Sequence, residues 1–306
     1  MSTLVFGHKS PDTDSTGSPI IWAWYLNEVK GIDAAPALLG EPNTEAAFVL
    51  DRWSLDKPQI ISDVADGQAV VIVDTNNPAE LPTNINKADI RAIIDHHKLV
   101  GGLETQGPIH ITMQPLACTA TIMHDMIGED LSKAPEGIKG AMLSCILSDT
   151  LEFRSPTTTD HDRAVAEKLA GELGVNISDF AAELFAAKSD VSAFSEEELL
   201  RMDSKEYEVG GNQFRVSVLE TTSPKMVLDR KDALVAAMPR VAEQDGADQV
   251  LLFVIDILNE EATLLIPNEL CKAVAEKSFG ASVSGDTVVL PGVMSRKKQI
   301  IPNLKV

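Results

Sequence analysis

The chain has 306 residues, long enough for two domains with adequate cores, and its formal net charge is −20. This acidity disfavours nucleic acid as a partner, and without a long apolar run or a basic leader we expect neither a membrane span nor a signal peptide. Three scattered cysteines without zinc-binding spacing suit a reducing compartment, so we expect a cytoplasmic protein without disulfide bonds.

The chain begins with a predicted strand and a polar loop. The apolar residues 3–6 predict a buried strand, and Pro11 within a Ser/Thr/Asp-rich stretch predicts a loop before a helix over about residues 15–29. Three side chains of this loop are suited to binding a metal ion: His8, Asp12 and Asp14.

Two further strands and a helix end in the same kinds of side chain. Residues 69–74 and 90–95 are apolar, as is typical of parallel strands covered on both faces, and residues 140–149 show helical spacing. Because ligands bind beyond the carboxyl ends of parallel strands, we expect these segments and the first loop to face one crevice. Their polar ends are Asp74, Asp95, His96, His97 and Asp149.

Carboxylates brought together in this way would repel one another and raise one another's pKa values unless cations intervene. Any one of them alone is better interpreted as a helix cap or a turn residue. As a set they favour a site for two divalent ions, because the chain has only six histidines and two are adjacent at a strand end. The four carboxylates are Asp12, Asp14, Asp74 and Asp149.

Strands continue to alternate with helices, including predicted helices over residues 119–126 and 160–173. This pattern indicates an α/β fold, with a doubly wound and mainly parallel sheet, for an N-terminal domain over residues 1–188. A composition shift predicts a linker over residues 189–195, directly before the capped start of a helix at Glu196.

Residues 196–306 predict a smaller α+β C-terminal domain that ends in a basic segment. Its expected elements are hairpins over 206–209 with 214–218 and over 249–258 with 263–266, helices near 225–243 and 268–279, and a strand over 287–290. A turn and the basic loop Arg296-Lys297-Lys298 follow this strand. Considered alone, such a short basic loop is more often a solvated surface than a binding site.

Together these motifs resemble those of the DHH phosphoesterase superfamily. They are Gly-His-Lys-Ser-Pro-Asp-Thr-Asp at residues 7–14, Val-Asp at 73–74, Asp-His-His at 95–97 and Leu-Ser-Asp at 147–149. The segment Ser-Arg-Lys-Lys-Gln at residues 295–299 and the overall length make the chain similar to family II, the manganese-dependent inorganic pyrophosphatases. The second domain then corresponds to a DHHA2-like substrate-binding domain. One departure is Thr75, where many members of the family have His.

The resemblance implies a two-metal site next to a substrate site. One ion is bound by His8, Asp12 and Asp74, and the other by Asp14, Asp74, His96 and Asp149, so that Asp74 bridges both. The catalytic and substrate-binding residues are His97, Lys205, Arg296 and Lys297. Because the three cationic residues lie beyond the linker, we expect the complete site to form only when the domains close.

The reaction implied by the resemblance is the hydrolysis of inorganic pyrophosphate to two phosphates. A hydroxide that bridges the metals attacks the nearer phosphorus in line, without a covalent intermediate, and His97 donates a proton to the leaving phosphate. Imidazole ligands favour Mn²⁺ or Co²⁺ over Mg²⁺, and a further Mg²⁺ accompanies the substrate. The family also implies a homodimer formed through the N-terminal domain.

Other functions stay open at this point. The chain could be another phosphoesterase of the superfamily, one that acts on short-chain polyphosphate or on oligonucleotides. The oligonucleotide activity is disfavoured, because the sequence lacks a Gly-Gly-Gly-His motif and an aromatic platform for stacking bases. A metal-dependent binding or sensing module without turnover is disfavoured by the full set of ligands and phosphate-binding cations.

Overall fold

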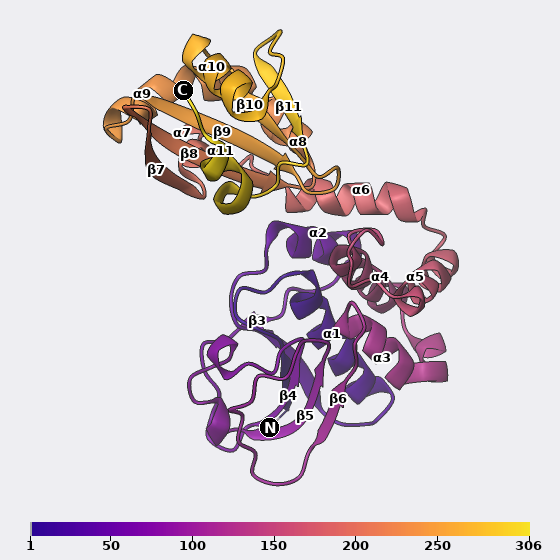
Figure 1. Ribbon diagram of the computed structural model, residues 1–306. Helices are drawn as coiled ribbons and strands as arrows, with labels where there is room; N and C mark the ends of the chain where they lie inside the picture. Colours follow the sequence, from indigo (N-terminus) through magenta and orange to yellow (C-terminus); the bar gives the residue numbers. More distant parts are fainter. Residues whose placement is uncertain (1) are drawn as a thin grey trace. The chain divides into compact units, whose positions relative to one another are not determined.

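The computed structural model describes residues 2–306, apart from the side chain of Lys297. The chain divides into two compact units, Met1–Lys188 and Ser189–Val306 (Figure 1). In the described part of the chain, no helix combines the length and the apolar character that crossing a membrane requires.

The first unit contains a six-stranded, all-parallel sheet. Its strand order is β3-β2-β1-β4-β5-β6, so the chain reverses its direction of winding between β1 and β4. Ligands of doubly wound sheets bind beyond the carboxyl ends of the strands at such a switch point. The expected α/β class is confirmed. The strands are β1 (Thr3–Phe6), β2 (Ala34–Leu38), β3 (Gln59–Ile60), β4 (Ala69–Val73), β5 (Asp89–Asp95) and β6 (His110–Met113).

Strands β2 and β3 were not predicted from the sequence, and neither was the edge strand β6. Strand β2 contains Pro36 among small residues, and β3 has only two residues, so neither of these two shows the apolar run that identifies a buried strand. Strands β2 and β3 lie on the same side of β1, whereas the predicted strands β4 and β5 lie on the other side.

Helices and short 3₁₀ turns connect these strands, and α1 packs against α3 and α4. Gly17 permits the contact between α1 and α4, because a Cβ at this position would lie 2.4 Å from the Sγ atom of Cys145. The α-helices are α1 (Thr13–Glu28), α2 (Thr44–Arg52), α3 (Thr119–Ile127), α4 (Glu136–Thr150), α5 (Asp160–Leu173) and α6 (Ile177–Lys188), and the 3₁₀ turns are Pro78–Glu80, Ile85–Lys87 and Gly128–Lys133.

Helix α1 begins two residues earlier than predicted. The Asp12 side chain accepts a hydrogen bond from the Ser15 backbone N–H at 3.0 Å and is the N-cap of the helix. Asp14 therefore lies in the first helical turn and not in the preceding loop, which fixes its direction relative to the sheet.

The second unit contains a mixed five-stranded sheet of order β11-β10-β9-β8-β7, in which only β8 and β9 run parallel. Both predicted hairpins are present. The strands are β7 (Ser204–Val209), β8 (Asn212–Thr221), β9 (Gln249–Asp256), β10 (Glu261–Leu265) and β11 (Thr287–Pro291), and the helices are α7 (Glu196–Arg201), α8 (Pro224–Leu228), α9 (Lys231–Gln244), α10 (Glu269–Phe279) and α11 (Ile301–Asn303).

Two expectations for the second unit were wrong. The single helix expected over residues 225–243 is two helices, α8 and α9, separated at Asp229 and Arg230. The basic segment expected as a loop is one turn of π-helix, Arg296–Ile300, because the Ser295 hydroxyl caps it by accepting from the Lys298 N–H.

Candidate metal centre

The loop after β1 carries the first ligand candidates and is held tightly on helix α1. The backbone N–H of His8 donates to the Ser15 hydroxyl at 2.8 Å. Gly7 allows this approach, because a Cβ there would lie 2.0 Å from the same hydroxyl oxygen. The imidazole of His8 is thereby placed over the N-terminus of α1, beside the capping residue Asp12 at 3.7 Å.

Asp74, directly after β4, lies between two imidazoles. One of its carboxylate oxygens is 3.4 Å from His8 Nε2, and the other is 3.3 Å from His96 Nε2. Its backbone has a φ of +56°, a left-handed conformation that few non-glycine residues adopt and that Asp tolerates better than most. A single buried carboxylate thus has one oxygen directed to each side of the centre.

The third side of the centre is formed by Asp14 and Asp149. One oxygen of Asp14 accepts from the Ser18 hydroxyl and the other from the Thr119 N–H, both at 2.7 Å. Asp149, in the last turn of α4, has a buried Oδ2 atom without a hydrogen-bond partner among the described residues. An unpartnered buried carboxylate oxygen is costly unless a cation binds it.

Three groups of side chains in the described part of the chain have ligand atoms within 4.8 Å of one another. They share residues, so they form one continuous centre that contains every metal-ligand candidate from the sequence, together with His97. The groups are His8, Asp12 and Asp74; Asp14, His96 and Asp149; and Asp74, His96 and His97.

Backbone carbonyl groups orient two of the imidazoles. Nδ1 of His8 lies 2.7 Å from the Lys9 carbonyl oxygen, and Nδ1 of His96 lies 3.2 Å from that of Leu116. Each carbonyl accepts a hydrogen bond from the Nδ1–H group, which leaves the unprotonated Nε2 facing the carboxylates and free to bind a metal ion.

His97 is also oriented through its Nδ1 atom, but by a carboxylate instead of a backbone carbonyl. Its Nδ1 lies 2.9 Å from Oδ1 of Asp95, a carboxylate with no exposed surface that also accepts from Asn76 at 2.6 Å. The hydrogen bond that His97 donates to Asp95 raises the pKa of His97. Nδ1 is thus engaged, and this pair is suited to donating a proton from Nε2.

Without cations, the buried carboxylates of the centre repel one another and shift the pKa values of the groups around them. Burial, together with the neighbouring Asp74, raises the pKa of Asp14 to about 6, and burial with Asp14 and Asp74 raises the pKa of Asp149 well above its ordinary value. Burial opposes protonation of the histidines, but nearby carboxylates outweigh it and raise the pKa of His8 to about 11 and of His96 to about 9.

Divalent cations would remove this conflict, so the residues present fit a metal centre. The donors are imidazole nitrogens and carboxylate oxygens, a mixture that suits Mn²⁺ better than Mg²⁺. The unpartnered oxygen of Asp149 would become a ligand, and the carboxylates would no longer need protons to coexist.

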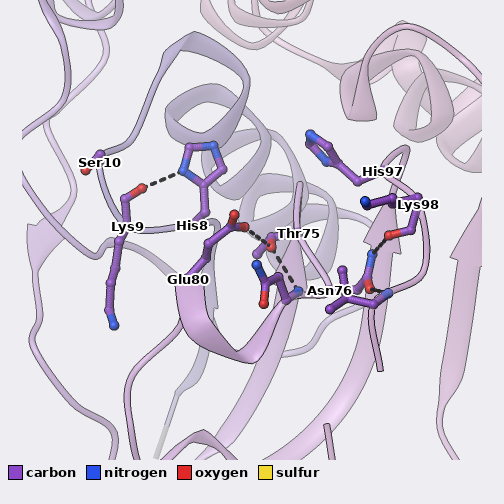
Figure 2. Close-up of a pocket in the computed structure, with 10 residues that line it drawn as sticks. His8, Lys9, Ser10, Thr75, Asn76, Glu80, His97 and Lys98 are labelled. Carbon is purple, nitrogen blue, oxygen red and sulfur yellow. Dashed lines mark hydrogen bonds between the residues drawn. The ribbon is translucent and has the colours of Figure 1, made fainter. Parts of the chain in front are cut away.

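A cavity of about 390 Å³ adjoins the centre. Figure 2 shows His8 and His97 on two sides of it, with Thr75, Asn76 and Glu80 between them. Thr75 donates to the Glu80 carboxylate at 2.7 Å and accepts from the Asn77 N–H, so it fixes the turn after Asp74.

The remaining site candidates lie in the second unit. Lys205 is exposed on β7. Arg296 donates to the backbone carbonyl of Asp203 and, at 2.7 Å, to the carboxylate of the same residue. The backbone of Lys297 continues the π-helix, but its side chain lies outside the described residues.

Comparison with known proteins identifies the family. The DHH family, N-terminal domain, matches residues 2–149, and the DHHA2 domain matches residues 182–306. The probable manganese-dependent inorganic pyrophosphatase of Deinococcus radiodurans is 40% identical over 307 residues, covering 98% of this chain and 97% of that protein. The Bacillus subtilis manganese-dependent inorganic pyrophosphatase is 36% identical over 303 residues, with the same coverage. The chain belongs to the manganese-dependent inorganic pyrophosphatase family.

A solved structure of the same family has a similar fold. The crystal structure of the Methanococcus jannaschii putative family II inorganic pyrophosphatase matches with a TM-score of 0.62 and 34% identity, covering 99% of this chain and 98% of that one. The resemblance inferred from the motifs is therefore confirmed at the level of the family.

Several residues that hold the ligand candidates of this pyrophosphatase-family centre have little signal in the sequence. Thr119 donates to Asp14 and, at 3.3 Å, to Asp74, and its only signal is its place at a helix start. The roles of Asp95 and of the Leu116 carbonyl depend on how chain segments meet, which sequence patterns do not specify.

Proposed function

We propose that this chain hydrolyses inorganic pyrophosphate to two phosphates and that the centre around Asp74 binds the two metal ions of the reaction. The observation that carries this proposal is one buried carboxylate, Asp74, between His8 and His96, with further carboxylates on both sides. Two of the relatives, from Deinococcus radiodurans and Bacillus subtilis, are named for this activity and for manganese.

Each ion has a group of ligands in this proposal. His8, Asp12 and Asp74 would hold one, and Asp14, Asp74, His96 and Asp149 the other, so that Asp74 is shared. When bound, the ions would supply a water of lowered pKa and neutralise charge on the phosphoryl oxygens. Mn²⁺ is the expected metal, Co²⁺ and Mg²⁺ are expected substitutes, and a further Mg²⁺ is expected to arrive with the substrate.

The side chains have separate tasks. Asp95 holds Nδ1 of His97, so His97 is placed to donate the Nε2 proton to the leaving phosphate. In the second unit, Lys205, Arg296 and Lys297 would bind phosphate oxygens, with the planar guanidinium offering two parallel hydrogen bonds. The reaction needs no covalent intermediate, because water is the nucleophile.

A phosphate-release assay tests the function directly. Metal-stripped protein should be inactive, and added Mn²⁺ or Co²⁺ should restore hydrolysis better than Mg²⁺ alone. Full activity in excess chelator would contradict the two-metal proposal. Faster turnover of tripolyphosphate than of pyrophosphate would instead assign the chain to short-chain polyphosphate.

We also propose that the chain is cytoplasmic and forms a homodimer through its first unit. Its three cysteines are buried free thiols, as suits a reducing compartment. At the edge of the sheet, β6 pairs with β5, and Ile111 on β6 is 57% exposed, which fits a covered edge in an assembly. Sedimentation equilibrium tests the dimer, and Ile111→Glu should weaken it if this edge is the interface.

A further inference from the structure

Glu45, in the first turn of α2, is a carboxylate with no exposed surface that lies outside the set of ligand candidates. Burying a carboxylate is unfavourable unless charges or hydrogen bonds compensate for it. Its Oε2 atom receives three donors, whereas its Oε1 atom is buried without a partner among the described residues. The donors are the hydroxyls of Thr13 and Ser148 and the ammonium of Lys188.

Two of these donors belong to the segments that carry the metal ligands. Thr13 lies between Asp12 and Asp14, and its hydroxyl is 2.8 Å from Glu45 Oε2. Ser148 immediately precedes Asp149, and its hydroxyl is 2.7 Å from the same oxygen. One carboxylate oxygen therefore joins the start of α1 to the end of α4.

A backbone contact reinforces this connection. The N–H of Asn43, the N-cap of α2, donates to the carbonyl of Pro11 at 3.0 Å. The residue before Asp12 is thus hydrogen-bonded to the same helix end that carries Glu45. The N-terminus of α2 therefore holds the metal-ligand loop through both backbone and side chain.

The third donor is the last residue of the first unit. Nζ of Lys188 lies 3.4 Å from Glu45 Oε2, the same oxygen that accepts from the hydroxyl of Thr13, the residue directly after Asp12. An ammonium held against the segment that carries the ligands would oppose the binding of a metal cation there unless a carboxylate offset its charge. Glu45 supplies that charge.

We propose that Glu45 is a positioning residue of the metal centre, which fixes the ligand-bearing segments of α1 and α4 and neutralises Lys188 at the start of the interdomain connection. The inference rests on the proposed function, since it concerns the same metal centre. It assigns Glu45 no contact with the ions or the substrate.

Calorimetric titration of the metal-stripped full-length protein with Mn²⁺ tests this role. In Glu45→Gln, the ammonium of Lys188 lacks its counter-charge beside the ligand-bearing segment, so the Mn²⁺ dissociation constant should rise about 10–100-fold, as for other residues that orient metal ligands. Adding Lys188→Met to Glu45→Gln should restore the constant to within about threefold of wild type, because no unpaired cation remains. A merely structural role would not give this rescue.

A milder variant and a matched control complete the design. Ser148→Ala keeps the carboxylate but removes one hydrogen bond, so it should weaken Mn²⁺ binding about 2–10-fold. The control ion pair is Lys139 with Glu172, 2.8 Å apart in the same unit, and Lys139→Met should leave Mn²⁺ binding unchanged. Circular dichroism checks that each variant is folded at the titration temperature.

The inference would be overturned if Glu45→Gln and Ser148→Ala both bound Mn²⁺ as wild type does, or if the Glu45 and Lys188 substitutions had independent effects. The wild-type titration and phosphate-release assay separate this outcome from a failure of the proposed function. If wild type neither binds Mn²⁺ nor releases phosphate, the function is wrong; if it does both and the variants match it, only the role of Glu45 is wrong.

Discussion

The two units hold their candidate functional side chains in different ways. In the first unit the ligands are fixed by buried hydrogen bonds, as when Asp14 receives two donors at 2.7 Å. In the second, Lys205 is exposed, and the guanidinium of Arg296 donates to the backbone carbonyl and the carboxylate of Asp203. Carboxylates that repel one another must be held in place before cations bind, whereas an exposed ammonium such as that of Lys205 can adjust to an anion.

Because of this difference, we expect substitutions in the two units to affect different properties of the protein. Changes in the first unit should alter metal affinity, and changes in the second should alter the use of pyrophosphate while leaving metal affinity intact. Each variant below is therefore measured in two ways, by Mn²⁺ titration and by steady-state phosphate release.

The largest effect is expected for Asp74→Ala. Because both histidines and both ligand groups depend on this carboxylate, turnover should fall by more than about 10³-fold, beyond the 10–100-fold typical of a residue that only supports a ligand. Titration should show that both metal sites are weakened. Asp130→Ala, at an exposed ion pair of the same unit, is the control, and two unaltered sites in Asp74→Ala would refute the bridging role.

Arg296→Ala should have the next largest effect. Loss of one preorganised donor to an oxyanion typically lowers kcat by about 10²–10³-fold, and we expect a loss of this size in kcat/KM. Mn²⁺ binding should be unchanged, because the residue belongs to the second unit. Arg240→Ala, on the same unit, is the control with no expected effect. Weakened Mn²⁺ binding in Arg296→Ala would contradict the proposal that only the first unit determines metal affinity.

The structure brings together the ligand candidates that the sequence predicted, and most of them lie at the end or start of an element with a strong local pattern. Asp74 and His96 follow apolar strands, and parallel strands bring their carboxyl ends to one edge, so the meeting of these residues follows from the fold class. Asp149 lies at the end of α4, and the helical spacing of residues 140–149 predicted that position.

The supporting contacts could not be predicted in this way. Glu45 looks like an ordinary acidic residue in the first turn of a helix, and its burial depends on where α2 and α6 pack. Likewise, the pairing of Asp203 with Arg296 joins residues 93 positions apart. Such contacts arise from tertiary packing, which local patterns do not encode.

The two adjacent histidines give a sharper test within the first unit. His97→Gln should lower turnover by about 10²-fold or more, the usual value of a positioned acid, with Mn²⁺ affinity nearly unchanged. His96→Gln should instead weaken Mn²⁺ binding, because its Nε2 faces Asp74. The opposite pattern would mean that the roles of the two residues are exchanged.

The pH dependence of metal binding should show how many protons the two imidazoles of the first unit release. In the metal-free protein, the raised pKa values of His8, about 11, and His96, about 9, mean that both carry a proton at neutral pH. Metal binding must displace these protons, so Mn²⁺ affinity should rise between pH 6 and 8, on the order of tenfold per pH unit for each proton displaced. Titrations in buffers of different ionisation enthalpy count the protons, and a pH-independent affinity would contradict this prediction.

The smallest effect is expected for Asp203→Asn, which tests how the second unit holds its cation. Asp203 has a φ of +36°, and Asn tolerates this left-handed backbone as well as Asp does, so the turn should persist. The backbone carbonyl still accepts from Arg296, but the charged hydrogen bond at 2.7 Å becomes a neutral one. The guanidinium should then be less well oriented for phosphate, and KM should rise by about 2–10-fold with a smaller change in kcat. Asp286→Asn, at the exposed ion pair with Lys231, should leave both constants unchanged. A fall in kcat at constant KM would show instead that Asp203 acts on the chemical step and not on the orientation of the substrate-binding cation.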